Sequence, residues 1–146
     1  MSRASVGEVL ELFISEPSKR ERTPKMVIEL DEGGVVDDKF HGKEKERSVL
    51  LTTTGSYAMA REENITIAHG SLGENILMDY NPYHLPMGKQ IEIGEVLLEV
   101  TQHCTICNHL SMVDPQLPTL LKDDRGIFVK VVQSGAIRRG DKIYLL

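Results

Sequence analysis

Two thiols and two imidazoles lie close together in the segment TQHCTICNHL at residues 101–110. They belong to His103, Cys104, Cys107 and His109. A thiolate is a nucleophile and a ligand for soft metals, and an imidazole is a common metal ligand. Because the flanking residues are polar, burial of both thiols is not expected. The pattern favours an accessible thiol that acts as a nucleophile, a sulfur carrier or a soft-metal ligand.

Three narrower interpretations of this segment depend on its surroundings. A structural zinc site would find enough donor atoms, but no second ligand pair follows downstream, and only His41, His69 and His84 lie elsewhere. Attachment of a c-type haem requires a histidine directly after the second cysteine, where Asn108 stands, so that interpretation is rejected. A thioredoxin-like pair requires a helix start in a βαβ unit, whereas the surrounding sequence favours strands.

Cations beside glycine-bearing or strand-opening segments are the candidates for contacts with an anion: Lys39, Arg47 and Arg125. A further group of cations lies in a proline-bounded loop and is more typical of a solvated loop than of a site: Lys19, Arg20, Arg22 and Lys25. The two glycines of GSLGEN predict a tight bend, which is either a plain turn into the apolar run that follows or a loop that presents backbone N–H groups to a ligand. Asp38 and Asp141 are predicted to be structural, because an aspartate near a turn often accepts backbone N–H bonds.

The elements that must position these residues are predicted from apolar runs and turn residues. Strands are predicted in the runs rich in Val, Ile and Leu, at residues 7–15, 26–30, 48–53, 90–93, 95–101, 126–133 and 142–146. One helix is predicted at residues 55–63, with Thr54 as its cap. A mainly β chain with glycine-rich turns favours a closed or partly closed β-barrel with one or two short helices.

Composition limits the class of protein. The 146 residues fit a single domain over residues 1–146, and a net charge of −5 argues against nucleic acid as a partner. No segment approaches the roughly 18 unbroken apolar residues of a membrane span, and the N-terminus lacks an apolar signal core. Two cysteines three positions apart are not a secreted disulfide framework. We therefore expect a soluble, cytoplasmic protein without a membrane partner.

Taken in order, these segments resemble the MOSC domain family, which is named for the C-terminal region of molybdenum cofactor sulfurase. GGVVDDKFHG is similar to the family's glycine-aspartate-basic loop, and RSVLLTT to the arginine-led strand that follows it. HGSLGENI resembles the glycine-glutamate-asparagine signature, and MGKQIEIGEVLLEVT the paired strands. GIFVKVVQSGAIRRGDKIYLL resembles the closing strands, so the resemblance covers most of the chain and implies a MOSC-type β-barrel.

The resemblance implies an association with the molybdenum cofactor (molybdopterin). It assigns the reactive cysteine to Cys107, which follows the Val-Thr strand end at the family's distance and would be the catalytic thiol or a metal ligand. The residues then expected to bind the cofactor are Lys39, Arg47, Gly73, Glu74, Asn75 and Arg125. Two positions depart from the pattern: Cys104 stands where relatives often have a basic residue, and Asp37 stands where they commonly have glycine.

Three functions are consistent with these features. The first is a domain that binds the molybdenum cofactor or carries sulfur on Cys107 as a persulfide. A pyridoxal-phosphate domain is far larger than this chain, so no pyridoxal-phosphate site is expected, and a separate cysteine desulfurase or molybdoenzyme would be the partner. The second is a molybdenum-dependent reductase component acting on N-hydroxylated compounds. The third is a non-catalytic, zinc-stabilised adaptor, so the sequence does not decide whether the protein is an enzyme.

Overall fold

The computed structural model describes residues 4–19, 21–104 and 113–146. The described chain is mainly β, as predicted. Its strands are β1 (Gly7–Ile14), β2 (Thr23–Lys25), β3 (Val27–Asp31), β4 (Gly34–Val35), β5 (Val49–Thr53), β6 (Ile76–Met78), β7 (Gln90–Ile93), β8 (Val96–His103), β9 (Ile127–Gln133), β10 (Gly135–Arg138) and β11 (Lys142–Leu145). Its helices are α1 (Thr54–Glu62), α3 (Leu117–Leu120) and the 3-10 turn η1 (Lys45–Arg47).

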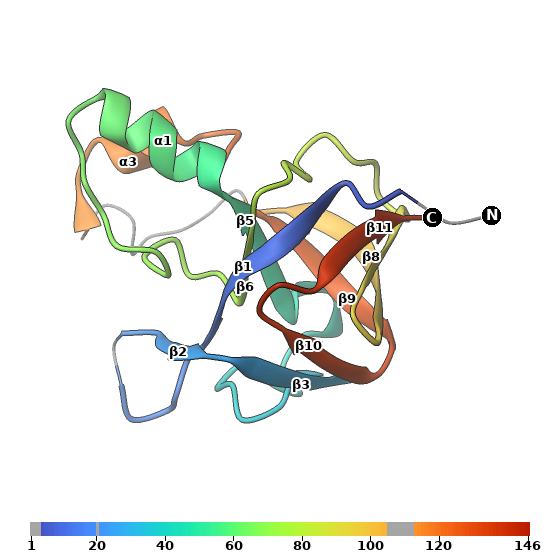
Figure 1. Cartoon of the computed structure of the whole chain (residues 1–146). Coiled ribbons are helices and arrows are strands. Elements are labelled where there is room, and N and C mark those ends of the chain that lie inside the picture. Colours follow the sequence, from blue (N-terminus) through green and yellow to red (C-terminus); the bar gives the residue numbers. More distant parts are fainter. Residues whose placement is uncertain (1–3, 20, 105–112) are drawn as a thin grey trace.

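Seven strands form a closed barrel in the order β11, β7, β8, β9, β5, β6 and β1 (Figure 1). The ring closes where β1 pairs with β11 through Gly7 and Ile143. β5 and β6 run parallel, and the other neighbours in the ring run antiparallel. The barrel prediction is thereby confirmed, and the barrel is fully closed.

The barrel interior is filled by aliphatic side chains. Along β7, β8 and β9 every second residue is buried, as expected for strands with one face turned inward. Ile91, Leu98, Val129 and Ile143 are among the fully buried residues. Each such side chain contributes about 1.5–3 kcal/mol when fully buried, so this core fixes the barrel from which the connecting loops project.

A second, three-stranded sheet has the order β10, β3 and β4. The sequence interpretation found β3 but not its partners. β10 lies in SGAIRRGD, a segment with the glycines and charges of a turn, and β4 has only two residues. Only the pairing with β3, in which Ala136 faces Glu29, identifies β10 as a strand.

The predicted helix at residues 55–63 is confirmed as α1, which begins one residue earlier at Thr54. Thr54 is therefore not the cap. Thr53 occupies that position without a side-chain cap, and its backbone N–H instead donates to the Tyr83 hydroxyl at 3.1 Å. In Figure 1, α1 and α3 lie together at one side of the barrel. Tyr57, Leu77 and Leu117 are among the buried residues that join them to it.

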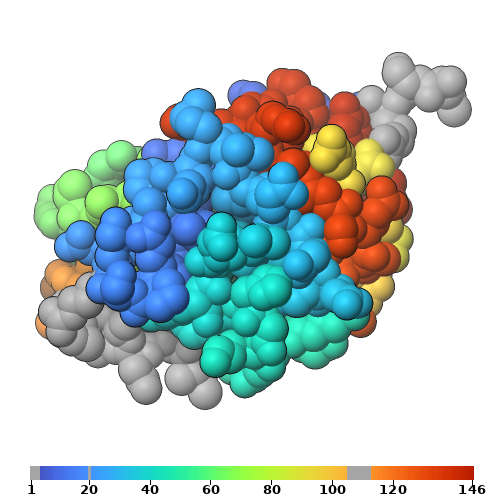
Figure 2. Space-filling view, turned by 90° about the horizontal axis from the view of Figure 1, so that it is seen from below, coloured from blue at the N-terminus to red at the C-terminus, as the bar shows by residue number. Residues whose placement is uncertain are grey.

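Three connections supply most of the residues that line one pocket: the link from β1 to β2, the loop that follows β4, and the link from α1 to β6. Figure 2 shows the first of these in blue and the loop after β4 in cyan to teal on the same face of the molecule. The backbone N–H of Lys39 donates to the carbonyl of Ser15 at 2.7 Å, which joins the two directly.

Candidate functional site

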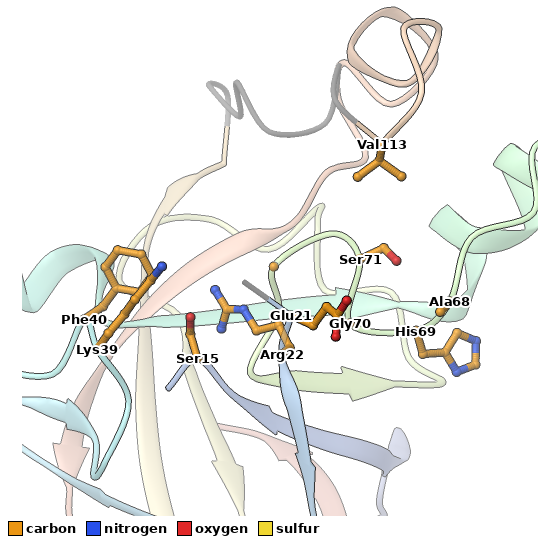
Figure 3. Close-up of a pocket in the computed structure, with 11 residues that line it drawn as sticks. Ser15, Glu21, Arg22, Lys39, Phe40, Ala68, His69, Gly70, Ser71 and Val113 are labelled. Atoms are coloured by element: carbon orange, nitrogen blue, oxygen red, sulfur yellow. The ribbon is translucent and has the colours of Figure 1, made fainter. Parts of the chain in front are cut away.

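A pocket of about 620 Å³ lies where these connections meet. Small-molecule sites commonly have volumes of about 300–1,000 Å³, so this pocket has the size of a ligand site. Figure 3 shows Lys39 and Phe40 on one side, His69 and Ala68 on the other, and Val113 above. The lining residues are Ser15, Glu21, Arg22, Lys39, Phe40, Ala68, His69, Gly70, Ser71, Gly73 and Val113.

One side of the pocket carries two cations, Arg22 and Lys39, and an aromatic ring, Phe40; we name these three residues the cationic wall. The guanidinium carbon of Arg22 lies 6.0 Å, and Nζ of Lys39 lies 5.2 Å, from the centre of the Phe40 ring. Glu21 is the carboxylate among the described lining residues. In a chain of net charge −5, this arrangement suits an anionic group attached to a planar or apolar body.

The buried carboxylate of Asp38 positions this wall. Its Oδ1 accepts the backbone N–H of Ser15 at 2.6 Å, and its Oδ2 accepts that of Phe40 at 3.0 Å. Nη1 of Arg22 lies 3.7 Å from Oδ1. Asp38 thus contacts three residues that line the pocket, and the prediction that it fixes its loop by accepting backbone N–H bonds is confirmed. Asp141 does the same at a turn, accepting the N–H of Arg138 at 2.7 Å.

Asn75 connects Asp38 to the barrel. Its side-chain amide donates to Oδ1 of Asp38 and to the carbonyl of Phe13, each at 3.3 Å. Its side-chain oxygen accepts the backbone N–H of Leu50 at 3.1 Å. Because Phe13 is in β1 and Leu50 in β5, this one side chain links two barrel strands to the carboxylate behind the cationic wall.

The opposite side of the pocket is the segment at residues 68–73, which we name the glycine loop. Gly70 and Gly73 have φ angles of 94° and 88°, a left-handed conformation that side chains other than hydrogen disfavour. A Cβ added to Gly70 would also lie 3.1 Å from the ring of Phe13. The predicted bend is present, and both glycines are needed for it. The backbone N–H groups of residues 70–73, however, donate within the protein, to the Tyr57 hydroxyl and to the carbonyls of Ala68 and Gly70, so the expectation that they face a ligand is wrong.

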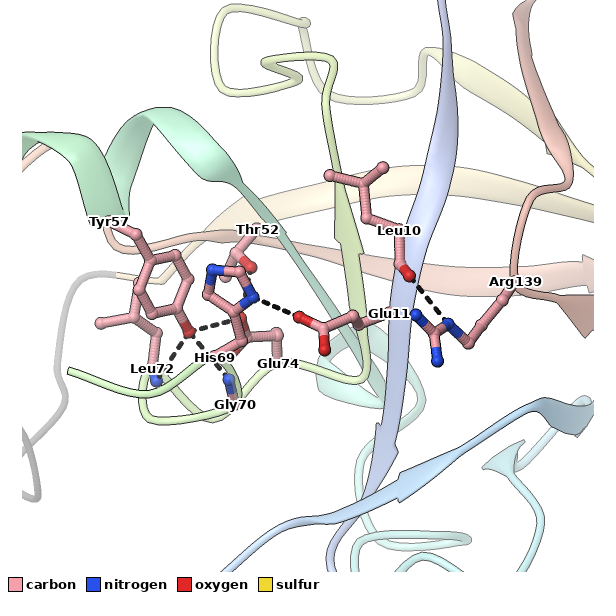
Figure 4. Close-up of polar contacts among 9 residues, drawn as sticks. All are labelled: Leu10, Glu11, Thr52, Tyr57, His69, Gly70, Leu72, Glu74 and Arg139. Atoms are coloured by element: carbon pink, nitrogen blue, oxygen red, sulfur yellow. Dashed lines mark hydrogen bonds and ion pairs between the residues drawn. The ribbon is translucent and has the colours of Figure 1, made fainter.

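Two buried side chains lie behind the glycine loop. The hydroxyl of Tyr57, from α1, accepts the backbone N–H groups of Gly70 at 3.0 Å and Leu72 at 3.4 Å, and donates to Oε2 of Glu74 at 2.5 Å (Figure 4). The same Oε2 accepts the hydroxyl of Thr52 at 2.8 Å. Burial, and then the charge of Glu74, raise the pKa of Tyr57 above its usual range, so the phenol keeps its proton.

His69 is the ionisable side chain of the glycine loop. Its Nδ1 is hydrogen-bonded to a carboxylate oxygen of Glu11, on the outer surface of β1 (Figure 4). Its ring also packs edge-on against Tyr57, with ring centres 4.8 Å apart. Both His69 and Glu11 are partly exposed, so water weakens the attraction between them.

The predicted cofactor-binding residues fall into three groups. Lys39 and Gly73 line the pocket, whereas Glu74 and Asn75 lie behind it with the contacts given above. The two other cations do not line it. Arg47 stacks on Phe128 at 4.9 Å, and Nη2 of Arg125 donates to the carbonyl of Pro118 at 2.9 Å.

Of the two cysteines, the structure describes Cys104. It is buried, and its backbone N–H donates to the carbonyl of Gly126 at 3.0 Å. Cys107, the predicted functional thiol, lies outside the described residues. Val113, the first described residue after it in sequence, lines the pocket.

Within the described ranges, no three or more His, Cys, Asp or Glu side chains gather closely enough to bind a metal ion. Of the helices described, none is long and apolar enough to cross a membrane.

Sequence reasoning did not assign four residues that build the pocket: Arg22, Phe40, Tyr57 and His69. Arg22 belongs to a basic run that is typical of a solvated loop. Only its contact with Asp38, in another loop, distinguishes it from a solvated cation. Phe40 directly follows Asp38 and Lys39 in sequence, and this position only weakly indicates that it belongs to the site. Nothing local indicates Tyr57 or His69, because their partners lie in other elements.

Comparisons with known proteins give a consistent result. The MOSC domain family matches residues 37–144. The structure is similar to the YuaD protein of Bacillus subtilis, with a TM-score of 0.85, 17% identity and coverage of 99% of this chain and 97% of that one. It is also similar to YiiM of Geobacillus stearothermophilus (TM-score 0.78, 17% identity, 96% and 75% coverage) and of Escherichia coli (0.70, 18%, 95% and 69%). A comparison with curated proteins found no match.

Proposed function

The chain belongs to the MOSC domain family, and on that basis we propose that its pocket binds the molybdenum cofactor and that Cys107 is its functional thiol. The observation that carries the proposal is the cationic wall, with Arg22 and Lys39 beside one pocket and the buried Asp38 behind them. An acidic protein that places two cations at a ligand-sized pocket is suited to an anion with a ring system.

The chemistry of the lining residues fits the cofactor. Its phosphate would be bound by Arg22 and Lys39, since charged hydrogen bonds to phosphate are among the stronger polar contacts. Its pterin would lie against Phe40 and the glycine loop, where the Ser71 hydroxyl offers a hydrogen bond. When bound, the cofactor supplies a redox-active metal centre; the residues named here bind and orient it.

Cys107 is proposed as the thiol that carries sulfur or ligates the metal. A separate cysteine desulfurase would supply the sulfur. In that reaction the Cys107 thiolate attacks the terminal sulfur of the desulfurase persulfide. A Cys107 persulfide forms, and the desulfurase cysteine leaves as a thiolate. Cys104 is a poor candidate for this role because it is buried.

The test is purification from cells that make the cofactor, followed by counting molybdenum and pterin per chain. Arg22→Ala with Lys39→Ala should lower occupancy about tenfold or more, because each charged hydrogen bond contributes about 1.5–3 kcal/mol when buried. Arg138→Ala is the matched control, since Arg138 is an exposed cation that does not line this pocket. Zinc without pterin in the wild-type protein would contradict the proposal.

The thiol is tested separately by persulfide labelling and mass spectrometry. Cys107→Ser should abolish sulfur loading or molybdenum retention while the fold is kept. Cys104→Ala should leave the label in place. A label on Cys104, or equal loss in both variants, would overturn the assignment of Cys107.

A further inference from the structure

We infer that Tyr57 is a positioning residue for the ligand of this pocket, because its phenol oxygen joins the buried Glu74 to the backbone of the glycine loop. Tyr57 is not among the lining residues. The inference takes the identity of the ligand from the proposed function. The positioning of the glycine loop by Tyr57 depends on geometry alone.

The hydrogen bonds of the phenol have one possible direction. The amides of Gly70 and Leu72 can only donate, so the phenol oxygen accepts from both. A carboxylate can only accept, so the single phenol proton goes to Glu74. One oxygen atom therefore fixes two backbone amides of the glycine loop relative to α1.

The amides that Tyr57 binds belong to the part of the glycine loop that lines the pocket, and Gly70 is itself a lining residue. Leu72 is fully buried behind the loop, whereas its neighbours Ser71 and Gly73 line the pocket. The ring of Tyr57 also packs against His69, another lining residue. A shift of the two amides would therefore move His69, Gly70, Ser71 and Gly73 together and change their distance to the cationic wall.

Glu74 makes this arrangement depend on Tyr57. The carboxylate is fully buried, and among the described residues its Oε1 has no hydrogen-bond partner. Its Oε2 accepts hydrogen bonds from Thr52 and Tyr57. Removing the phenol hydroxyl would leave a buried acid with one of these donors, so Tyr57→Phe should also destabilise the fold.

A second buried tyrosine provides the matched control. The hydroxyl of Tyr83 accepts the backbone N–H of Thr53 at 3.1 Å and hydrogen-bonds to Ser56 at 2.8 Å. Neither partner lines the pocket. Tyr83→Phe thus removes a comparable buried hydroxyl from the same side of the barrel without touching the glycine loop.

The experiment compares wild type, Tyr57→Phe, Tyr83→Phe and the double variant Tyr57→Phe, Glu74→Gln. Backbone amide exchange is measured by NMR at Gly70 and Leu72, and cofactor content is measured as molybdenum and pterin per chain. Tyr57→Phe should speed exchange at both amides about tenfold and lower cofactor retention about tenfold. Tyr83→Phe should change neither the exchange nor the retention. The double variant should recover stability, since no buried charge loses its donor, but not retention.

Two results would overturn the inference. One is unchanged exchange at Gly70 and Leu72 in Tyr57→Phe. The other is retention that returns with stability in the double variant, which would show that Tyr57 acts only through the fold. If wild type retains no cofactor, the proposed function is wrong, and amide exchange alone decides whether Tyr57 positions the loop.

Discussion

The two sides of the pocket are fixed by different means. The cationic wall is positioned by a carboxylate, Asp38, which binds two backbone N–H groups and lies 3.7 Å from Arg22. The glycine loop is positioned by a neutral phenol, Tyr57, whose pKa is raised by burial and by Glu74. The first side therefore depends on charge, and the second on the location of a single protonated hydroxyl.

This difference separates two contributions to ligand binding: the charge that attracts the ligand and the shape of the pocket. Arg22 and Lys39 present charge to a ligand, and Asp38 keeps that charge in place. The glycine loop lines the pocket with Ala68, His69, Ser71 and its two glycines, so its contribution depends on where its backbone lies. Asn75 spans both parts, because it bonds to Asp38 and directly follows Glu74 in sequence. Asn75 therefore couples the two sides.

The largest expected effect is that of Asp38→Ala. The substitution leaves the buried N–H of Ser15 and the partly buried N–H of Phe40 without their acceptor, and should lower the free energy of unfolding by about 3 kcal/mol. Urea denaturation measures it. Asp141→Ala, which removes one acceptor at a less buried turn, should cost about 1 kcal/mol. Equal losses would show that Asp38 is an ordinary loop residue.

The next effect appears in alkali. Burial is the main cause that raises the pKa of both Tyr57 and Tyr83. A tyrosine with a raised pKa in the folded state stabilises the fold fully below about pH 10, and that stability is lost as the pH rises. Above pH 10, each of the two tyrosines should lower the free energy of unfolding by about 1.4 kcal/mol per pH unit. Tyr57→Phe and Tyr83→Phe should each remove one tyrosine's contribution to the slope of the free energy of unfolding against pH. A slope that stays unchanged would show that the substituted phenol is not buried.

The smallest expected effect concerns the pair of Glu11 and His69. Both side chains are partly exposed, so Glu11→Gln should change the free energy of unfolding by no more than about 0.5 kcal/mol. Because Tyr57 still packs on His69, amide exchange in the glycine loop should stay as in wild type. Faster exchange there would assign to Glu11 the positioning role given to Tyr57.

Strand periodicity and turn residues predicted much of the fold. The barrel strands rich in Val, Ile and Leu follow from local sequence because their burial alternates along the chain. Helix α1 follows from its helix-forming residues. β10 was missed because its strand character depends on pairing with β3. Local propensity does not contain that information.

The candidate site was predicted less completely, for a similar reason. Lys39 and the glycine loop carry short sequence signals, and the structure brings them to one pocket. Arg47 has equal charge but stacks on Phe128, and Arg125 bonds to Pro118. A cation beside a glycine is a candidate for the site, but tertiary contacts determine which cations line the same pocket. Arg22 lines the pocket, although its sequence context is that of a solvated loop.

The most direct test of the central claim is to locate molybdenum in crystals of protein made in cells that produce the cofactor. An anomalous difference map at the molybdenum absorption edge gives the position of the metal without assuming a site. We predict a peak in the pocket between the cationic wall and the glycine loop, with pterin density whose phosphate contacts Arg22 and Lys39. A well-occupied molybdenum peak elsewhere on the barrel, or crystals that contain zinc and no molybdenum, would contradict the account.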